Sequence, residues 1–490
     1  MDPEASTMGE FTLLSQNDIE SIHSASLHLL EKTGLAVKNS AALQLLENAG
    51  CGIESNRVRF PTDLVESCLS KVPKSFRLYT RERDRYLTVG GNEVIFNPGS
   101  SASDFLDSET GEIRRGTSRD LVRLIELADA LPYMDAVSTA VITSDVPESI
   151  SDLFRLYLVL KHSDKPIVTG AFTKEGIADM KLMLEAVAGG SKELVRSPHA
   201  IFDCCPTSPL TWNDVSSQNL IDCATSSIPA EIVPAPMMGA TGPVTIFGTL
   251  VQSNAEILAG IVIAETANPG TPVVYGGSLA LFDMKQGVIC LGAIETAMAE
   301  CAASQIGKYY GIPTHAYLGL SDSKLPDAQS GFESAIGLML ASLARINVVS
   351  GPGMLAFENC QSLEKLVIDN EICGMARRLM RGVESENTES IVSLLDSVGP
   401  SGEFLSADHT LTSFRHCQFF PSEITSRQPV HTWKDAGSSD AYARARERVE
   451  KTLRTHSSKP LPDASKESLD STLIMILRNR GLSSGSIPAV

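Results

Sequence analysis

The residues that could do chemistry in this sequence stand mainly in short loops that combine glycine and proline with hydroxyl, thiol and charged side chains. Five such loops occupy residues 205–209, 236–243, 275–278, 319–324 and 350–353. Glycine lets the backbone approach a ligand closely, and proline stiffens the loop that holds it. Each loop follows a short β-branched run, so all five fall at the same end of the predicted strands. We therefore interpret this end as a binding site rather than a set of ordinary turns.

The familiar nucleotide and nucleophile motifs are absent or out of place. Residues 349–356 fit the pattern G-x-G-x-x-A and Asp369 follows them, but the next helical pattern begins only near Leu363. A dinucleotide fold needs its helix to begin inside the glycine loop, so nucleotide binding is not predicted. The sequence also lacks a Walker loop and a G-x-S-x-G elbow.

Metal ligands do not occur at the spacing that a metal site requires. Cys204, Cys205, Cys290 and His315 could meet in the fold, but none of them stands at zinc-ligand spacing from another. Buried thiols are the better interpretation of these cysteines. No metal site is predicted.

Charge and hydropathy exclude several classes of function. Asp and Glu number 59 against 41 Lys and Arg, which gives a formal net charge of −18. Such a chain lacks the clustered basic residues that bind nucleic acid and is better suited to a cationic ligand. The most hydrophobic stretch, residues 257–267, contains Glu265 and predicts a core helix rather than a membrane span.

Cysteine usage and the N-terminus indicate a cytoplasmic protein. The ten cysteines are scattered and form no CxxC pair, which is typical of reduced thiols. Residues 1–11 are acidic and contain neither a basic nor an apolar region, so no secretory signal is predicted.

The elements that must position the loops form a strand–helix repeat. The predicted strands are 94–97, 134–141, 166–170, 199–205, 231–236, 272–277, 313–319 and 346–351. The helical patterns between and after them are 118–131, 147–162, 174–188, 214–226, 245–267, 289–310, 328–344 and 363–381. Parallel strands with crossover helices follow from this alternation, and eight units are the number that closes a (β/α)₈ TIM barrel, an α/β fold. An open doubly wound sheet is the alternative that the pattern leaves.

Segments that lack the strand–helix alternation flank the repeat on both sides. Residues 1–91 are predicted to be a mostly helical segment that packs on the barrel, residues 92–395 the catalytic barrel, and residues 396–490 a helical extension. In the first segment we expect helices at 18–31 and 40–48, a helix after Pro61 and a strand at 76–79. In the last we expect helices at 441–455 and 468–480, and we interpret this segment as a packing or oligomer arm.

The stretch 311–333, GIPTHAYLGLSDSKLPDAQSGFE, resembles the trimethylamine methyltransferase family, the corrinoid-dependent amine methyltransferases and their relatives without pyrrolysine. Similar blocks are LLEKTGLAV at 29–37, CPTSPL at 205–210, GTLVQSNAEILAGI at 248–261, VVYGGSLALFDMKQG at 273–287, GPGML at 351–355 and LVIDNEI at 366–372. The resemblance covers nearly the whole chain. It implies a (β/α)₈ barrel, in agreement with the count of strands and helices.

One position departs from the family pattern. In the archaeal trimethylamine enzymes, pyrrolysine precedes a Ser-Asp-x-Lys run, whereas here Leu320 precedes Ser321-Asp322-Ser323-Lys324. Pyrrolysine is thought to capture the tertiary amine and to give its nitrogen a positive charge, which leucine cannot do. The resemblance and its departure together imply a substrate that arrives already charged. A quaternary amine of the betaine type, such as glycine betaine, carnitine or proline betaine, meets this requirement.

The resemblance also implies a methyl acceptor on another protein. The acceptor would be the Co(I) centre of a corrinoid (cobalamin) held by a partner corrinoid protein, since this chain shows no corrinoid-binding signature of its own. Co(I) is a strong nucleophile, so the reaction is an in-line displacement that needs little acid–base help. The barrel would position the methyl group, exclude water and accommodate the cation.

Aromatic faces and carboxylates usually hold a quaternary cation. The candidates near predicted strand ends are Tyr275, Phe282, Tyr317, Phe332 and Phe357 for an aromatic cage, and Glu295, Asp322, Glu333 and Glu358 for charge. Core packing is the alternative for each aromatic, and a buried polar partner is the alternative for Glu295.

Two further candidates stand in the motif loop and one in a strand. Lys324 and Gln329 could bind a substrate carboxylate or hold the loop, and the loop role is favoured. His315 either contacts the substrate or is a hydrogen-bonded core residue. Leu320, Asp322, Lys324 and Glu295 are the expected catalytic residues.

Two other functions remain as alternatives. A TIM barrel could instead be a metal-dependent hydrolase or lyase. A relative of the family could also bind a methylamine or a corrinoid protein without catalysing a reaction. A homo-oligomer is expected in each case.

Overall fold

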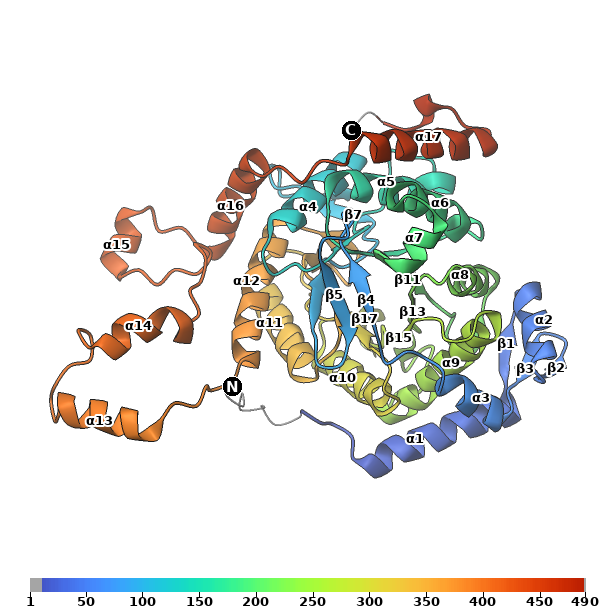
Figure 1. Ribbon diagram of the computed structural model, residues 1–490, viewed down its shortest axis with the longest axis horizontal. Coiled ribbons are helices and arrows are strands. Elements are labelled where there is room, and N and C mark those ends of the chain that lie inside the picture. Colours follow the sequence, from blue (N-terminus) through green and yellow to red (C-terminus); the bar gives the residue numbers. More distant parts are fainter. Residues whose placement is uncertain (1–10, 489–490) are drawn as a thin grey trace.

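The computed structural model, which describes residues 11–488, contains eight parallel strands that form a closed barrel (Figure 1). The barrel strands are β6 (Ile95–Asn97), β9 (Val137–Ser138), β10 (Ile167–Gly170), β11 (Ala200–Cys204), β13 (Ala230–Ile232), β15 (Val273–Tyr275), β18 (His315–Ala316) and β19 (Val348–Ser350). Strands β9 to β15 form one parallel sheet, and β18, β19 and β6 form another. Tyr275 N donates to Pro313 O, and Asp135 N donates to Phe96 O, so backbone hydrogen bonds close both gaps.

This closure confirms the predicted barrel and excludes the open doubly wound sheet. Each predicted strand run overlaps one barrel strand, although β13 begins one residue before its predicted start, and each helical pattern contains one main helix. These helices are α4 (Ser118–Ala130), α5 (Ser151–His162), α6 (Gly176–Ala188), α8 (Asp214–Thr225), α9 (Ile246–Ala267), α10 (Ile294–Tyr309), α11 (Ala328–Leu343) and α12 (Leu363–Met380). Helix α10 begins later than predicted because β17 (Val288–Cys290) pairs with β16 (Ala280–Asp283) as a hairpin.

The barrel interior has an apolar lower layer and a polar upper layer. The lower layer consists of Ile95, Ala136, Val168, Ile201, Val274 and Val348, with Leu78 and Val89 from the hairpin β4 (Ser75–Tyr79) and β5 (Tyr86–Gly90). Side chains of a strand alternate between faces, so the residue two positions later points inward one layer higher. By this rule Ile201 is followed by Asp203, and Val348 by Ser350.

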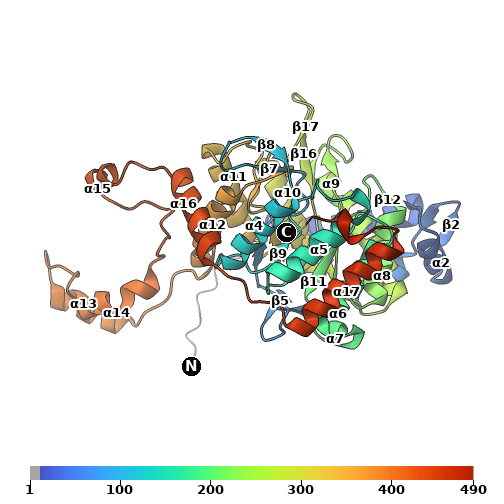
Figure 2. The same ribbon diagram turned by 90° about the horizontal axis from the view of Figure 1, so that it is seen from above.

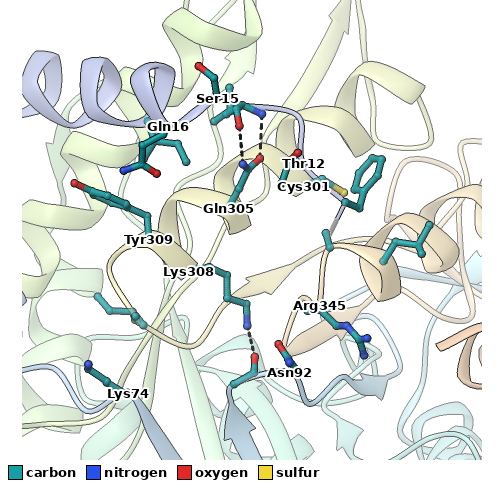
Figure 3. A pocket seen from close by; sticks show the side chains of 18 of the residues that line it. Thr12, Ser15, Gln16, Lys74, Asn92, Cys301, Gln305, Lys308, Tyr309 and Arg345 are labelled. Carbon is teal, nitrogen blue, oxygen red and sulfur yellow. Dashed lines mark hydrogen bonds between the residues drawn. The ribbon is translucent and has the colours of Figure 1, made fainter. Parts of the chain in front are cut away.

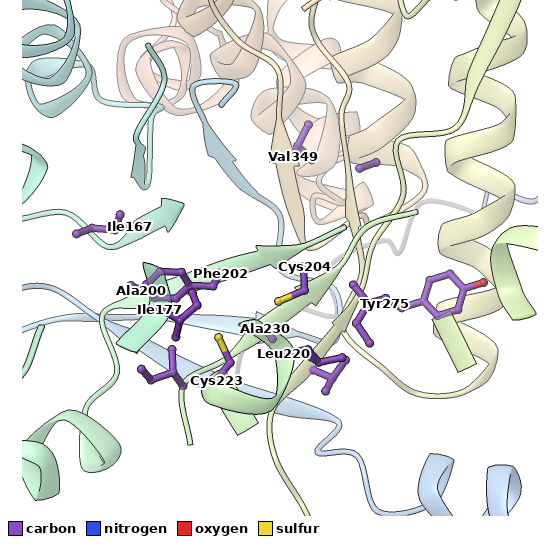
Figure 4. Packing of buried hydrophobic residues seen from close by; sticks show 14 of the residues in the cluster. Ile167, Ile177, Ala200, Phe202, Cys204, Leu220, Cys223, Ala230, Tyr275 and Val349 are labelled. Carbon is purple, nitrogen blue, oxygen red and sulfur yellow. The ribbon is translucent and has the colours of Figure 1, made fainter. Parts of the chain in front are cut away.

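The outward side chains of the same strands pack under the helices. Phe202 and Cys204 of β11 lie in the main apolar core with Leu220 and Cys223 of α8 (Figure 4). Helix α9 is long and apolar enough to cross a membrane by composition alone, but 78% of its apolar window is buried inside the protein. It therefore belongs to this core, as its sequence predicts.

The N-terminal segment contains the three expected helices, α1 (Gln16–His28), α2 (Ser40–Asn48) and α3 (Thr62–Leu69), which pack near α9. It also contains strands that the sequence does not predict. β1 (Leu35–Val37) pairs with β12 (Thr211–Trp212) in the barrel loops, and β2 (Gly52–Glu54) and β3 (Arg57–Arg59) extend that sheet. Strands of two or three residues leave no periodic pattern, because partners distant in sequence stabilise them.

The remaining elements lie in the loops and the C-terminal region. They are α7 (Ser191–Arg196), β7 (Asp104–Leu106), β8 (Ile113–Arg115), β14 (Met237–Met238), β20 (Met354–Leu355), β21 (Cys360–Gln361), α13 (Thr388–Val398), α14 (Asp408–Cys417), α15 (Val430–Asp435), α16 (Ala441–Thr455) and α17 (Asp463–Asn479). Helix α16 has the predicted bounds and packs on α12, whereas α17 begins before its predicted start and packs on α6. Helices α13 and α14 project away from the barrel (Figures 1 and 2).

Candidate active site

Tyr317 lies at the centre of a buried polar cluster above the carboxyl ends of the strands. Its hydroxyl donates to Asp203 Oδ2 over 3.1 Å and lies 2.8 Å from Ser100 Oγ. Its ring meets the His315 ring edge-on, with the centroids 4.8 Å apart. Asp203, Ser100 and His315 come from three different strand ends, so the barrel itself assembles this cluster.

His315 continues the cluster on its other side. Its Nε2 lies 3.1 Å from Ser350 Oγ and 3.7 Å from Glu231 Oε2, and Ser350 Oγ in turn donates to Asn97 Oδ1 over 3.0 Å. Burial lowers the pKa of His315 to about 3, so the imidazole is neutral at physiological pH. Because His315 is neutral, it does not compensate a negative charge on Glu231.

Four carboxyl groups surround this region without a basic counter-ion. Burial raises the pKa of Asp203 to about 6 and that of Glu358 to about 8, and it raises those of Glu231 and Glu300 well above their usual range. Among the described residues, Asp203 Oδ1, both Glu231 oxygens and Glu300 Oε2 accept no hydrogen bond from a donor group, while the Asp203 and Glu231 carboxyls interact with each other. Within residues 11–488, no lysine or arginine nitrogen lies within 4.0 Å of any of the four groups. The site therefore suits a cation.

The backbone around Glu358 is held in an unfavourable conformation. Ala356, Phe357 and Glu358 have φ angles of 51°, 60° and 68°, so three consecutive residues with side chains are left-handed. Each such residue costs roughly 1–2 kcal/mol. Strained backbone of this kind clusters at functional sites. Hydrogen bonds fix the turn, since Ala356 N donates to Ser323 O over 2.8 Å and Asn359 Nδ2 donates to Phe357 O over 3.2 Å.

Leu320 provides an apolar surface next to this polar cluster. Its side chain is 2% exposed and packs in a small cluster that also contains Tyr317, Val233 and Leu291. Tyr317 thus belongs to both the apolar and the polar group. At position 320, directly before the Ser-Asp-x-Lys run, this chain has a hydrocarbon side chain and no nucleophile.

The motif that follows Leu320 mainly builds its own loop. Glu333 Oε2 accepts hydrogen bonds from Ser321 Oγ (2.5 Å) and Asp322 N (2.9 Å), and Gln329 Nε2 donates to Glu333 Oε1 over 2.9 Å. Asp322 Oδ1 accepts from Leu291 N over 3.0 Å, and burial raises the pKa of Asp322 to about 6.

Lys324 is also held within this loop. Its ammonium donates to Asp322 O over 2.8 Å and lies 3.9 Å from the centre of the Phe357 ring. These contacts agree with the loop-holding role that the sequence favours for Lys324 and Gln329. Phe357 is therefore occupied by a cation of the chain itself.

Several expected site residues lie elsewhere. Tyr275 points outward because Val274 points inward, and its hydroxyl donates to Asn254 Oδ1 over 3.0 Å on α9. Phe332 is 56% exposed on α11, and Glu295 is exposed in the first turn of α10. These three residues therefore lie outside the polar cluster around Tyr317, and their expected role in the site stays a prediction. Phe282 is half-buried on the β16–β17 hairpin, and no contact joins it to the cluster.

Asp203, Glu231 and Glu300 are the functional candidates that sequence reasoning missed. Asp203 and Glu231 each stand as the single charged residue within an apolar strand run, on the inward side of the alternation. Glu300 occupies the buried face of α10, where its Oε1 accepts from Leu279 N. The strand alternation could have identified Asp203 and Glu231 as inward-facing charges. The choice between Glu295 and Glu300 depends on the orientation of α10, which the sequence pattern does not give.

A buried ion pair fixes the loops on both sides of Leu320. Lys365 Nζ lies 2.5 Å from Asp369 Oδ2, and both side chains are 1% exposed. Lys365 also donates to Gly319 O (3.3 Å) and to Ser334 Oγ (2.8 Å), while Asp369 accepts from Gly353 N (2.7 Å). Asp369, the acid downstream of the glycine motif, thus holds loops together and binds no nucleotide in this role.

Within residues 11–488, no group of three or more His, Cys, Asp or Glu side chains is arranged to hold a metal ion. Cys204 faces Cys223 in the outer core, whereas Cys205 is exposed at the strand end, so the two do not converge. The possible zinc ligands considered from the sequence therefore do not meet.

Comparison with known proteins gives a consistent result. Residues 3–478 match the family model described as trimethylamine methyltransferase (MTTB). The glycine betaine methyltransferase of Desulfitobacterium hafniense (strain Y51) is 30% identical over 480 residues, covering 96% of this chain and 98% of that protein. The trimethylamine methyltransferase MttB of Methanosarcina thermophila is 31% identical over 464 residues, covering 92% of this chain and 95% of that protein.

Among solved structures, the monomethylamine methyltransferase (MtmB) of Methanosarcina barkeri is similar in fold. Its TM-score is 0.54 at 14% sequence identity, and the match covers 92% of this chain and 89% of that chain. At this identity the likeness supports the barrel fold alone.

The Lys365–Asp369 pair yields a stability prediction. Lys365→Met leaves Asp369 buried without its partner and should lower the free energy of unfolding by about 3–5 kcal/mol. The double variant with Asp369→Leu removes both charges and should recover most of this loss. Lys181→Met, which removes the more exposed Lys181–Glu185 pair, should cost less than about 0.5 kcal/mol. Urea unfolding followed by circular dichroism measures all three, and a double variant no more stable than the single one would refute the assignment.

Proposed function

Because this chain belongs to the trimethylamine methyltransferase family and is a methyltransferase, we propose that its substrate is a quaternary amine of the betaine type and that its methyl acceptor is a corrinoid on a partner protein. The proposal rests chiefly on one observation, the group of carboxyls without a basic partner, in which Glu231 and Glu300 are buried and Asp203 and Glu358 are half-buried. A permanently charged ammonium would supply the missing positive charge. A neutral ligand would leave these carboxyl groups protonated or unpaired.

The hydrocarbon side chain of Leu320 supports a quaternary rather than a tertiary amine. A tertiary amine must gain a proton or an adduct before its nitrogen becomes a leaving group. Leu320 can provide neither, and Tyr317 beside it already donates its proton to Asp203. A quaternary nitrogen needs no such help, because it leaves with the electron pair of the broken C–N bond as a neutral tertiary amine.

A buried arginine supports a substrate that also bears a carboxylate. Arg155 of α5 is fully buried, and its Nη1 donates to Thr139 O (2.8 Å) and Ser101 Oγ (3.3 Å). Its Nε and Nη2 have no partner, and no carboxylate lies within 4.0 Å of it among the described residues. These two nitrogens form the edge of the guanidinium that binds a carboxylate in a two-point contact.

The position of Arg155 relates it to the carboxyl cluster. Ser101, which contacts Arg155, is the neighbour in sequence of Ser100, which contacts Tyr317. The loop that contains Ser100 and Ser101 thus contacts Arg155 on one side and, through Tyr317, the carboxyl cluster on the other. A betaine carries the complementary charges in one small molecule. Phe172 covers the face of the guanidinium at 4.8 Å, so a carboxylate would contact the guanidinium at its buried Nε–Nη2 edge.

In the proposed reaction the chain binds and orients its substrate and excludes water. Asp203 and Glu231 stabilise the ammonium, and Leu320 provides an apolar wall beside it. A Co(I) corrinoid on the partner protein would supply the electron pair for the methyl carbon, and the electrons of the C–N bond would leave with the neutral tertiary amine. No protein group needs to donate or accept a proton. All ten cysteines are unpaired, which supports the placement of this reaction in the reducing cytoplasm.

The direct test mixes the purified protein with a reduced corrinoid protein and a panel of amines. Glycine betaine, carnitine or proline betaine should give the absorbance of methylated cobalt, and trimethylamine should not. Asp203→Asn should lower kcat/KM at least about tenfold, a loss of ~1.4 kcal/mol of transition-state stabilisation. Glu295→Gln, an exposed carboxylate on α10, should change nothing. Turnover of trimethylamine, or silence across the panel with an active carrier, would refute the proposal.

Binding of a quaternary cation should strengthen as pH rises. A cation favours ionised carboxylates, and the pKa values of Asp203 and Glu358 are raised to about 6 and about 8. Affinity should therefore increase between pH 5 and pH 8.5. Where binding releases one proton, the association constant should rise about tenfold for each pH unit. Calorimetry in two buffers of different ionisation enthalpy measures both affinity and protons released. The uncharged analogue 3,3-dimethylbutanol is the control, and equal pH dependence for both ligands would contradict the prediction.

Arg155 should discriminate between cations with and without a carboxylate. Arg155→Met should weaken binding of glycine betaine at least about tenfold and that of choline less than about twofold. Arg81→Met is the matched control, because Arg81 is also buried but donates to Leu160 O and Ser163 O away from the cluster. It should affect both ligands equally. Equal losses for both ligands with Arg155→Met would show that Arg155 is only structural.

A further inference from the structure

A cavity of about 1080 Å³ lies at the end of the barrel opposite to the candidate site (Figure 3). Its lining includes Gly91 and Asn92 before β6, Gly311 and Ile312 before β18, and Arg345 before β19. These residues all precede strands, so the cavity opens at the amino ends of the barrel. Catalytic groups of such barrels gather at the other end, so this cavity calls for a separate explanation.

The part of the cavity lining that residues 11–488 provide combines basic and apolar side chains. Lys74, Lys308 and Arg345 line it, and among these described residues no Asp or Glu does. Lys308 donates to Gly91 O (2.7 Å) and Asn347 Oδ1 (2.6 Å), and burial together with nearby Arg345 lowers its pKa to about 8. Arg345 makes no ion pair with the described residues. In a chain with a net charge of −18, this is an uncompensated basic site.

The chain also carries an acidic, amphipathic segment whose helices have no buried residue. We call residues 382–417 the arm; it contains α13 and α14, neither of which has a buried residue. Val392, Leu395 and Leu411 are 49%, 53% and 61% exposed. Helices of ten and eleven residues are marginal in water unless an apolar face is covered. The arm therefore requires a partner surface.

The charge of the arm is opposite to that of the cavity. Its charged residues other than histidine are Glu384, Glu386, Glu389, Asp396, Glu403 and Asp408 on the acidic side, with Arg415 alone on the basic side. An apolar helix face flanked by carboxylates matches a cavity whose lining is apolar and basic.

Both features lie at the same end of the barrel. Helix α12 ends at Met380, which lines the cavity, and the arm begins two residues later. Arg378 and Arg381 then donate to Cys417 O and His416 O, which pins the far end of the arm to its beginning. The arm therefore begins and ends next to α12, close to the cavity of its own chain. No residue of the arm lines that cavity.

We propose that the arm of one copy of this chain docks into the amino-end cavity of a second copy. One chain supplies both complementary surfaces, which is the condition for a symmetric exchange between identical subunits. The arm is long enough to provide one side of a standard interface, which takes roughly 20–30 residues. A protein that delivers the methyl acceptor must approach the opposite end of the barrel, so it does not compete for this surface.

Sedimentation velocity of the full chain over a concentration series tests this proposal. The wild type should associate, and Leu395→Asp, which places a charge in the exposed apolar face of α13, should raise the dissociation constant at least about tenfold. Glu386→Lys with Glu389→Lys should do the same, and so should Lys74→Glu with Arg345→Glu. Combining the arm and cavity reversals in one chain should restore association, since the charges are then complementary again.

The control substitution is Ile474→Asp on α17, an exposed apolar residue outside both surfaces, which should leave association unchanged. Circular dichroism checks that each variant is folded. A monomeric wild type at all concentrations would overturn the proposal. So would association that Leu395→Asp leaves intact, or charge reversals that weaken association separately but fail to restore it together. Methyl transfer is measured separately, so an inactive but associating protein would count against the proposed function only.

Discussion

Burial of carboxyl groups without basic counter-ions is the constraint on which the rest of this structure depends. An isolated buried carboxylate is costly, and a chain that keeps Asp203, Glu231, Glu300 and Glu358 in one region must recover that cost through neutral protonated forms or through a bound cation. The lower layer of the same barrel is filled by aliphatic side chains, and of these four residues Asp203 and Glu300 each also accept one hydrogen bond, from Tyr317 and from Leu279 N. Their presence above that layer is therefore better explained by binding than by stability.

The surrounding loops show the same division between support and chemistry. Gly319, Leu320 and Gly353 hold their positions because Lys365, Asp369 and Glu333 satisfy the backbone and side-chain groups around them. The charged residues of the Ser-Asp-x-Lys run make contacts within the loop itself. Leu320, which precedes the run, contributes an apolar surface next to Tyr317. A loop built in this way can present different residues at position 320 without changing its own structure.

The fold was predictable from the sequence because each barrel strand is a short β-branched run bounded by glycine and proline, and each helix covers one strand. The site was less predictable because it depends on side-chain direction. Tyr275 and Asp203 both stand near strand ends, yet one residue of alternation places the tyrosine outside and the carboxylate inside. Glu295 and Glu300 likewise share a helix but face opposite ways. The left-handed turn that carries Glu358 contains no glycine, so the sequence gives no indication of its positive φ angles.

The two ends of the barrel carry opposite uncompensated charges, and this arrangement separates their ligands. The carboxyl end attracts a small cation and repels an acidic helix, whereas the amino end, with Lys308 and Arg345, does the reverse. If the arm docks as proposed, its carboxylates lie at the amino end of the barrel, away from the carboxyl groups that are proposed to bind the cationic substrate. Subunit contact and substrate binding then use the same electrostatic principle without interfering with each other.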